Sequence, residues 1–110
     1  RDGEYMFKKI CASCHNIDGS GITSLAPTLI KSSIVNNTNI SIPIRTLLYG
    51  VEVKLGTDRK YGAAMTGLVD NEAINNGNIA ALLTYIRNSW GNKSGAITLE
   101  QVSKERKIVF

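Results

Sequence analysis

The feature that most constrains this chain is the run Cys11-Ala12-Ser13-Cys14-His15. A C-x-x-C-H motif has the spacing that attaches a c-type haem. Its two thiols can form thioethers with the two vinyl groups of one porphyrin, while the imidazole of the next residue reaches the iron from the same side. The motif therefore predicts one covalent haem c, with His15 as an axial ligand of its iron.

The same cysteine spacing also occurs in zinc sites and in dithiol oxidoreductases. A structural zinc ion takes four ligands, but the chain has two cysteines and one histidine. A dithiol oxidoreductase carries its motif between a strand and a helix, whereas residues 3–10 have a helical pattern and residues 16–21 a loop pattern. Both alternatives are disfavoured, and a disulfide between Cys11 and Cys14 remains open for a chain that never receives haem.

Length and composition favour one small domain built around a bulky cofactor. A chain of 110 residues forms a single core. Aromatic residues make up 6% of the chain, fewer than side chains alone would need to fill that core. No apolar run is long enough to span a membrane. No signal peptide is visible, and the sequence opens at a helix start, so we expect it to be processed or cut from a longer protein.

The charge pattern favours a protein partner over nucleic acid. The formal net charge is +4, and the two propionates of a ferric haem would bring it to about +3. The basic residues are scattered and lack the interleaved aromatic residues that single-stranded nucleic acid requires. We therefore expect redox partners that dock through an acidic face.

Periodicity and capping signals predict several helices. Residues 3–10 lead into the haem motif, and residues 41–50 form a short helix that walls the haem, with Ser41 as its N-cap and Gly50 as its end. The main C-terminal helix starts near residues 76–78, and its apolar stripe continues to Trp90. The stripe consists of Ile79, Leu82, Leu83, Ile86 and Trp90.

Two further elements are expected from local signals. Thr98 and Gln101 have the spacing of a capping box, which predicts a small helix over residues 99–106. The alternation of Val51, Val53 and Leu55 indicates a short strand or hairpin arm.

Gly3, Met6 and Phe7, placed ahead of the C-x-x-C-H motif, resemble the opening of class I c-type cytochromes. The resemblance covers most of the chain and implies an all-α fold of three to five helices around one covalent haem. It also implies that Gly3 and Phe7 of the first helix cross the last main helix at Leu82 and Tyr85.

The same resemblance supplies further roles at the haem. Pro27, twelve residues after His15, would accept a hydrogen bond from the other ring nitrogen of that histidine, and Leu29 would pack against the haem. Met65 stands where this class takes its sixth iron ligand, on a loop before the last main helix. The rival Met6 is five residues before Cys11 and so is poorly placed to reach the opposite haem face.

The stretch Leu83 to Asn92 resembles the cytochrome domains of some copper nitrite reductases and the cytochrome subunits of quinoprotein dehydrogenases. We therefore expect residues 1–110 to be one mono-haem domain, with residues 91–110 as an extension that carries the short helix. The expected function is one-electron transfer. The expected location is the periplasm, because c-type haem is attached on the outer side of the bacterial cytoplasmic membrane. The alternative is an electron-entry or electron-exit unit of such a reductase or dehydrogenase. A haem peroxidase or gas sensor is disfavoured, since each needs an open sixth position on the iron.

Overall fold

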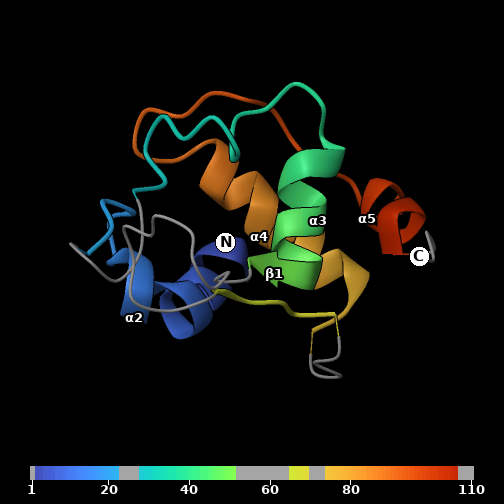
Figure 1. Ribbon diagram of the computed structural model, residues 1–110, viewed down its shortest axis with the longest axis horizontal. Helices are drawn as coiled ribbons and strands as arrows, with labels where there is room; N and C mark the ends of the chain where they lie inside the picture. Colours follow the sequence, from blue (N-terminus) through green and yellow to red (C-terminus); the bar gives the residue numbers. More distant parts are fainter. Residues whose placement is uncertain (1, 23–27, 52–64, 70–73, 107–110) are drawn as a thin grey trace, which may run out of the picture.

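The computed structural model describes residues 2–22, 28–51, 65–69 and 74–106 (Figure 1). For Asp2, Val51, Met65 and Thr66 it describes the backbone alone. Among the described residues, no helix has the length and apolar character needed to cross a membrane.

Helices make up most of the described chain, which confirms the predicted all-α class. In chain order the elements are α1 (Asp2–Met6), η1 (Phe7–Cys11), α2 (Ala12–His15), α3 (Ser41–Tyr49), β1 (Gly50–Val51), β2 (Met65–Thr66), α4 (Asn76–Arg87) and α5 (Leu99–Arg106). The first three follow one another without a break, so the helix predicted over residues 3–10 continues to His15. Its middle segment, η1, is a wider π-type turn.

The first helix is fixed by a close crossing with α4. A Cβ atom at Gly3 would lie 2.1 Å from the carbonyl oxygen of Ala81 and 2.8 Å from the Cβ of Tyr85, so only glycine fits there. One turn later, the ring of Phe7 is fully buried and lies 5.7 Å from the ring of Tyr85 and 5.0 Å from that of Trp90. The predicted crossing of these two helices is confirmed, with Ala81 as the residue opposite Gly3.

Helix α4 supplies the centre of the hydrophobic core. The predicted stripe is buried along the helix, from Ile79 and Leu82 (0% exposed) to Leu83 and Ile86 (3% and 5%). The helix ends at Arg87, however, so the stripe does not reach Trp90 as helix. Trp90 has a left-handed backbone (φ 55°) and packs partly buried against the core from the turn beyond.

Hydrogen-bonded caps define where the last two helices begin. Asn75 accepts a bond from the amide of Asn78, and the Asn78 side chain accepts one from the amide of Asn75, at 2.8 and 3.0 Å. This reciprocal box starts α4 where the sequence predicted. The box between Thr98 and Gln101 is also confirmed, with bonds of 2.8 and 3.2 Å, and it precedes α5.

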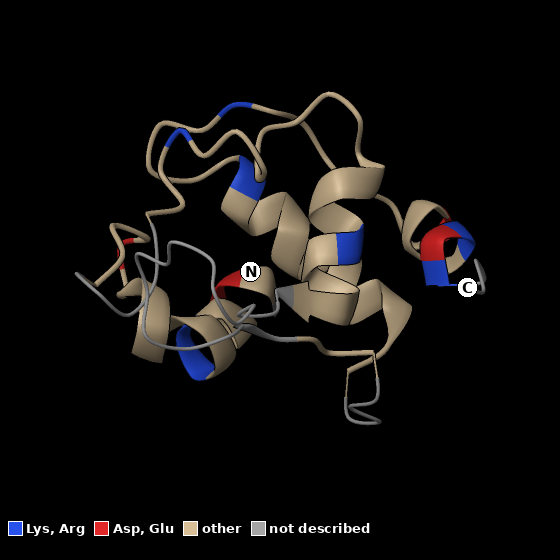
Figure 2. Ribbon diagram, viewed as in Figure 1, with Lys and Arg blue, Asp and Glu red and all other residues tan. Residues whose placement is uncertain are grey.

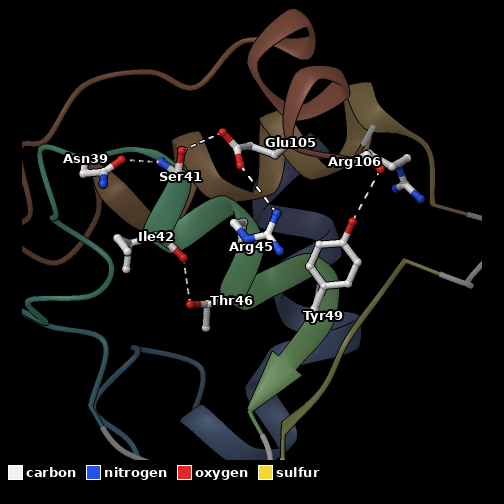
Figure 3. Close-up of polar contacts among 8 residues, drawn as sticks. All are labelled: Asn39, Ser41, Ile42, Arg45, Thr46, Tyr49, Glu105 and Arg106. Carbon is white, nitrogen blue, oxygen red and sulfur yellow. Dashed lines mark hydrogen bonds and ion pairs between the residues drawn. The ribbon is translucent and has the colours of Figure 1, made fainter. Parts of the chain in front are cut away.

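The prediction that Ser41 caps α3 is wrong. Ser41 is the first residue of the helix, and the side chain of Asn39 accepts a bond from its amide at 3.2 Å. Because the Ser41 backbone is already helical, its hydroxyl is turned to another partner, Glu105 of α5 (Figure 3). The predicted end at Gly50 is confirmed, since Gly50 has φ 79° at the end of the helix.

Helix α5 is held against α3 by a partly buried polar cluster (Figure 3). The hydroxyl of Ser41 donates to Oε2 of Glu105 at 2.6 Å, and Nη1 of Arg45 lies 3.8 Å from Oε1 of the same carboxylate. The guanidinium of Arg45 also lies 5.0 Å above the ring of Tyr49. Helix α5, within the described part of the C-terminal extension, is therefore packed onto α3.

Candidate functional site

The C-x-x-C-H motif lies across the end of η1 and the whole of α2. At this junction the amide of Ala12 bonds to the carbonyl of Phe7, a wider turn than that of an α-helix. Such turns occur within α-helices mostly as single insertions, often at functional sites. Cys11 is partly buried, Cys14 is exposed and His15 is buried. Cys11 ends one helical turn, and Cys14 and His15 lie together on the next, so that one segment can supply both tethers and a ligand.

Both thiols are free in the structure. Burial, with a smaller contribution from Cys14, raises the pKa of the Cys11 thiol to about 12. A dithiol oxidoreductase needs the opposite, because its attacking cysteine is activated by a lowered pKa. The surroundings of Cys11 therefore argue against dithiol redox chemistry.

The loop after the motif folds back onto its own helix. Asn16 ends α2 with a left-handed backbone (φ 68°), and the amide of Gly21 returns to donate to the carbonyl of His15 at 2.8 Å. The amide of Leu29 donates to the carbonyl of Gly19 at 2.7 Å, which brings Leu29 back beside the motif. The carbonyl of His15 is thus bound by the loop that follows the motif.

The resemblance assigned Leu29 and Pro27 to this side of the haem, and the structure describes the position of Leu29. Leu29 is partly buried and packs against the hydrophobic core. Pro27 lies outside the described residues, so its bond to the histidine ring stays a prediction.

A junction that the sequence analysis missed holds the Leu29 segment in place. Asn92 is 4% exposed, and its amide nitrogen donates to the carbonyls of Leu29 and Ile86, both at 3.0 Å. Its oxygen accepts bonds from the amide of Lys31 at 2.8 Å and the side chain of Asn36 at 3.2 Å. All four hydrogen-bonding positions of this amide are therefore filled.

Arg87, which ends α4, binds the same region with a buried guanidinium. Its nitrogens donate to four backbone carbonyls, those of Val35, Asn37, Ser94 and Gly95, at 2.6 to 3.3 Å. An arginine at a helix end normally suggests a solvated residue, since arginine is seldom fully buried. In the sequence, Arg87 and Asn92 stood out only as members of the stretch that resembles other cytochromes. That resemblance did not predict their hydrogen bonds.

The segment that carries Met65 runs along the end of α3. Strand β2 pairs antiparallel with β1, with Met65 opposite Val51, so Val51 lies in the predicted strand while Val53 and Leu55 lie outside the described residues. The Met65 side chain also lies outside the described part of the chain. Its role as a ligand therefore stays a prediction.

Met6, the rival candidate for the sixth ligand, contributes to packing. Met6, on α1, is partly buried and packs against the hydrophobic core. It shares one continuous helix with Cys11, so it belongs to the segment that carries the motif.

Comparison with known proteins identifies the family. The family model described as cytochrome c matches residues 1–90, and the chain belongs to the cytochrome c family. Its cofactor is covalently bound haem c, and the family is one of electron carriers.

The chain is similar to cytochrome subunits of dehydrogenases. It is 30% identical over 105 residues to the cytochrome c subunit of a quinone alcohol dehydrogenase from Gluconacetobacter polyoxogenes, a match that covers 94% of this chain and 22% of the relative. It is 24% identical over 106 residues to the fructose dehydrogenase cytochrome subunit of Gluconobacter japonicus, covering 96% of this chain and 22% of the relative. The chain thus spans about a fifth of the length of these relatives.

A solved structure shares the fold. The c-type cytochrome XoxG from Methylobacterium extorquens AM1 superposes with a TM-score of 0.58 at 23% identity, covering 94% of this chain and 64% of that one. The likeness supports the predicted all-α fold.

Proposed function

We propose that this chain is a one-electron transfer unit in which Cys11 and Cys14 hold the haem while His15 and Met65 ligate its iron. The observation that carries the proposal is the placement of Cys11, Cys14 and His15 on two adjoining turns of a helix anchored against α4. Haem c supplies the change of iron oxidation state when it is bound. The residues of the chain supply attachment, axial ligands and exclusion of water.

The proposed roles fit the burial of the three motif residues. Buried His15 is suited to a ligand that must be shielded from water, and exposed Cys14 is suited to a tether at the edge of the site. Pro27 and Leu29 complete this side, with Pro27 accepting a bond from the histidine ring and Leu29 covering the haem. A hydrogen bond to the second ring nitrogen fixes the orientation of a ligating imidazole and raises its basicity.

The sixth ligand decides between a carrier and a haem enzyme. A thioether favours ferrous iron, so a His/Met pair raises the reduction potential above that of a pair of nitrogen ligands. A filled sixth position also leaves no site for peroxide or a gas. Met65→Ala should therefore open that position, whereas Met6→Ala should cost only packing, at most about 2 kcal/mol for a partly buried methionine.

The test is spectroscopic and uses the haem-loaded chain. Native ferric protein should show the near-infrared charge-transfer band of iron bound to methionine sulfur, and native ferrous protein should bind carbon monoxide poorly. Met65→Ala should abolish the band, and Met65→His should keep six-coordinate iron at a lower potential. Persistence of the band in Met65→Ala would refute the ligand assignment. An intact mass equal to the bare polypeptide, after maturation with haem-attachment machinery, would refute the tethers.

We further propose that residues 1–110 form one mono-haem domain, extended by residues 91–110, that serves a larger redox system. The two dehydrogenase subunits described above favour the dehydrogenase form of that system over the nitrite reductase form. Attachment of haem c outside the cytoplasmic membrane supports a periplasmic location.

An acidic docking face on the partner is supported by the basic side chains that remain exposed. Figure 2 shows Lys and Arg spread over several helices and loops rather than gathered in one stripe. Arg87 is committed to internal bonds, whereas Lys8 and Lys9 are exposed on η1, next to Cys11. Electron-transfer rates with the physiological partner should fall as ionic strength rises. Rates that stay flat would remove the electrostatic part of the proposal.

A further inference from the structure

Arg106, the last residue of α5, makes two strong contacts with segments far away in the sequence. Its Nη1 donates to the carbonyl of Val69 at 2.8 Å, and its Nε donates to Oδ1 of Asn76 at 2.7 Å. Its own carbonyl accepts a weaker bond from the hydroxyl of Tyr49, at 3.5 Å (Figure 3). One guanidinium therefore joins the residue range 65–69 to the start of α4.

Val69 closes the segment that begins at Met65. The amides of Leu68 and Val69 donate to the carbonyls of Leu47 and Leu48, at 3.1 and 2.9 Å, so this segment runs along the end of α3. Gly67 makes that approach possible, because a Cβ atom there would lie 2.3 Å from the carbonyl oxygen of Leu48. With its amide bound to α3 and its carbonyl bound to Arg106, Val69 has both backbone groups fixed.

We propose that Arg106 is a positioning residue for the sixth iron ligand. It fixes the exit of the Met65 segment, four residues beyond the methionine, and so keeps the thioether on the iron. The proposal rests on the proposed function, in which Met65 is that ligand. Arg106 lies outside residues 1–90, which the family model matches, so this role belongs to the C-terminal extension.

The physical reason is the entropy of the ligand segment. A loop must be ordered each time its side chain binds the iron, and that cost competes with ligation. A charged donor that binds the Val69 carbonyl orders part of the segment before the ligand binds the iron. Such a donor is effective because hydrogen bonds to charged groups are stronger than neutral ones. Loss of that donor should raise the fraction of molecules in which Met65 has left the iron.

The alternative is that Arg106 merely attaches α5 to the fold. Ser41 provides the matched control, because its hydroxyl also attaches α5, through Glu105 at 2.6 Å, and this bond does not involve residues 65–69. Ser41→Ala should thus lower stability without affecting the ligand. A role in ligation and a role in packing then give different results.

The experiment compares haem-loaded Arg106→Met, Arg106→Lys, Ser41→Ala and Met65→Ala proteins with the native chain. The readouts are the rate of carbon monoxide binding to the ferrous form and the temperature at which the ferric methionine–iron band is lost, both measured well below global unfolding. Arg106→Met should bind carbon monoxide about tenfold faster, the factor expected from the loss of the charge-assisted bond to the Val69 carbonyl, the one of its two bonds that holds the ligand segment. Arg106→Lys, which keeps a charged donor but cannot reach both partners as a fork, should lie between Arg106→Met and the native chain.

Ser41→Ala should stay within about twofold of the native rate, because its bond is not part of the ligand segment. If Arg106→Met and Arg106→Lys bind carbon monoxide at the native rate, or if Ser41→Ala accelerates binding as much as they do, the inference is overturned. If Arg106→Met yields no folded protein, the comparison of Arg106→Lys with Ser41→Ala decides. If Met65→Ala loses the band but the Arg106 variants bind carbon monoxide at the native rate, only the inference about Arg106 is overturned. If Met65→Ala retains the band, the assignment of Met65 as ligand is overturned as well.

Discussion

Gly3 lies directly against the backbone of Ala81, with the carbonyl oxygen of Ala81 2.1 Å from where a Cβ atom of residue 3 would be. This contact joins the helix that carries the haem motif to α4, the helix at the centre of the hydrophobic core. Because the obstacle is a helix backbone, a larger residue at position 3 would have to push the two helices apart.

We predict that Gly3→Ala destabilises the haem-loaded protein by about 1 to 3 kcal/mol or more, the usual cost of overpacking a tight contact. Gly77→Ala is the matched control, since a Cβ there would meet its nearest atoms at 3.3 and 3.5 Å. Urea unfolding measures both variants. Equal effects at the two glycines would show that the helices separate easily and that the close crossing contributes little.

Asn92 should govern the order of the Leu29 segment. Asn92→Ala removes bonds to the Leu29 carbonyl and the Lys31 amide and leaves buried polar groups unsatisfied, which should cost about 2 kcal/mol or more. Hydrogen exchange should accelerate at the amides of Leu29 and Lys31 beyond the global change in stability. Asn88 is the control, because its exposed side-chain amide bonds to the carbonyls of Thr84 and Gly95. Asn88→Ala should leave the amides of Leu29 and Lys31 protected. Unchanged exchange at Leu29 in Asn92→Ala would contradict this account.

The carboxylate of Glu105 should contribute more to stability than an exposed ion pair. Glu105→Ala removes the acceptor for Ser41 and the charge near Arg45, so we expect a loss of about 1 to 3 kcal/mol in the free energy of unfolding. The exposed Glu4–Lys8 pair, at 3.1 Å, is the comparison, and Glu4→Ala should cost no more than about 0.5 kcal/mol. A Glu105→Ala variant as stable as Glu4→Ala would mean that α5 is held by its apolar contacts alone.

The reciprocal cap at the start of α4 should be worth about 1 kcal/mol. Asn75→Ala loses the side-chain acceptor for the Asn78 amide, whereas Asn75→Asp retains an acceptor of the same reach. Thermal unfolding of the two variants measures the difference. If Asn75→Asp is as unstable as Asn75→Ala, the loss does not come from the cap.

Local signals predicted the elements whose causes are local. The C-x-x-C-H motif, the apolar stripe of α4 and the box between Thr98 and Gln101 each depend on residues within one or two helical turns. The start of α3 was misplaced by one residue because the helix begins without a side-chain cap: its N-cap position is Ile40, and Asn39 accepts a bond from the Ser41 amide instead.

The rest was set by contacts between distant residues. Arg87 bonds to Val35 and Asn37, and Arg106 to Val69, across separations of 52, 50 and 37 residues, and no periodicity records such pairs. Trp90 shows the opposite case. Its spacing continued the helical stripe, yet α4 ends at Arg87 and the ring reaches the core from a left-handed turn.

The position of Trp90 makes it a natural optical reporter of the fold. It is the one tryptophan in the chain, and its ring lies 5.0 Å from that of Phe7 on the helix that carries the haem-attachment motif. A porphyrin tethered to that helix absorbs the light that a nearby tryptophan emits, so the folded haem-loaded protein should be nearly dark in fluorescence. When the helices separate, emission returns, and its recovery follows the release of the first helix from α4 without any added label.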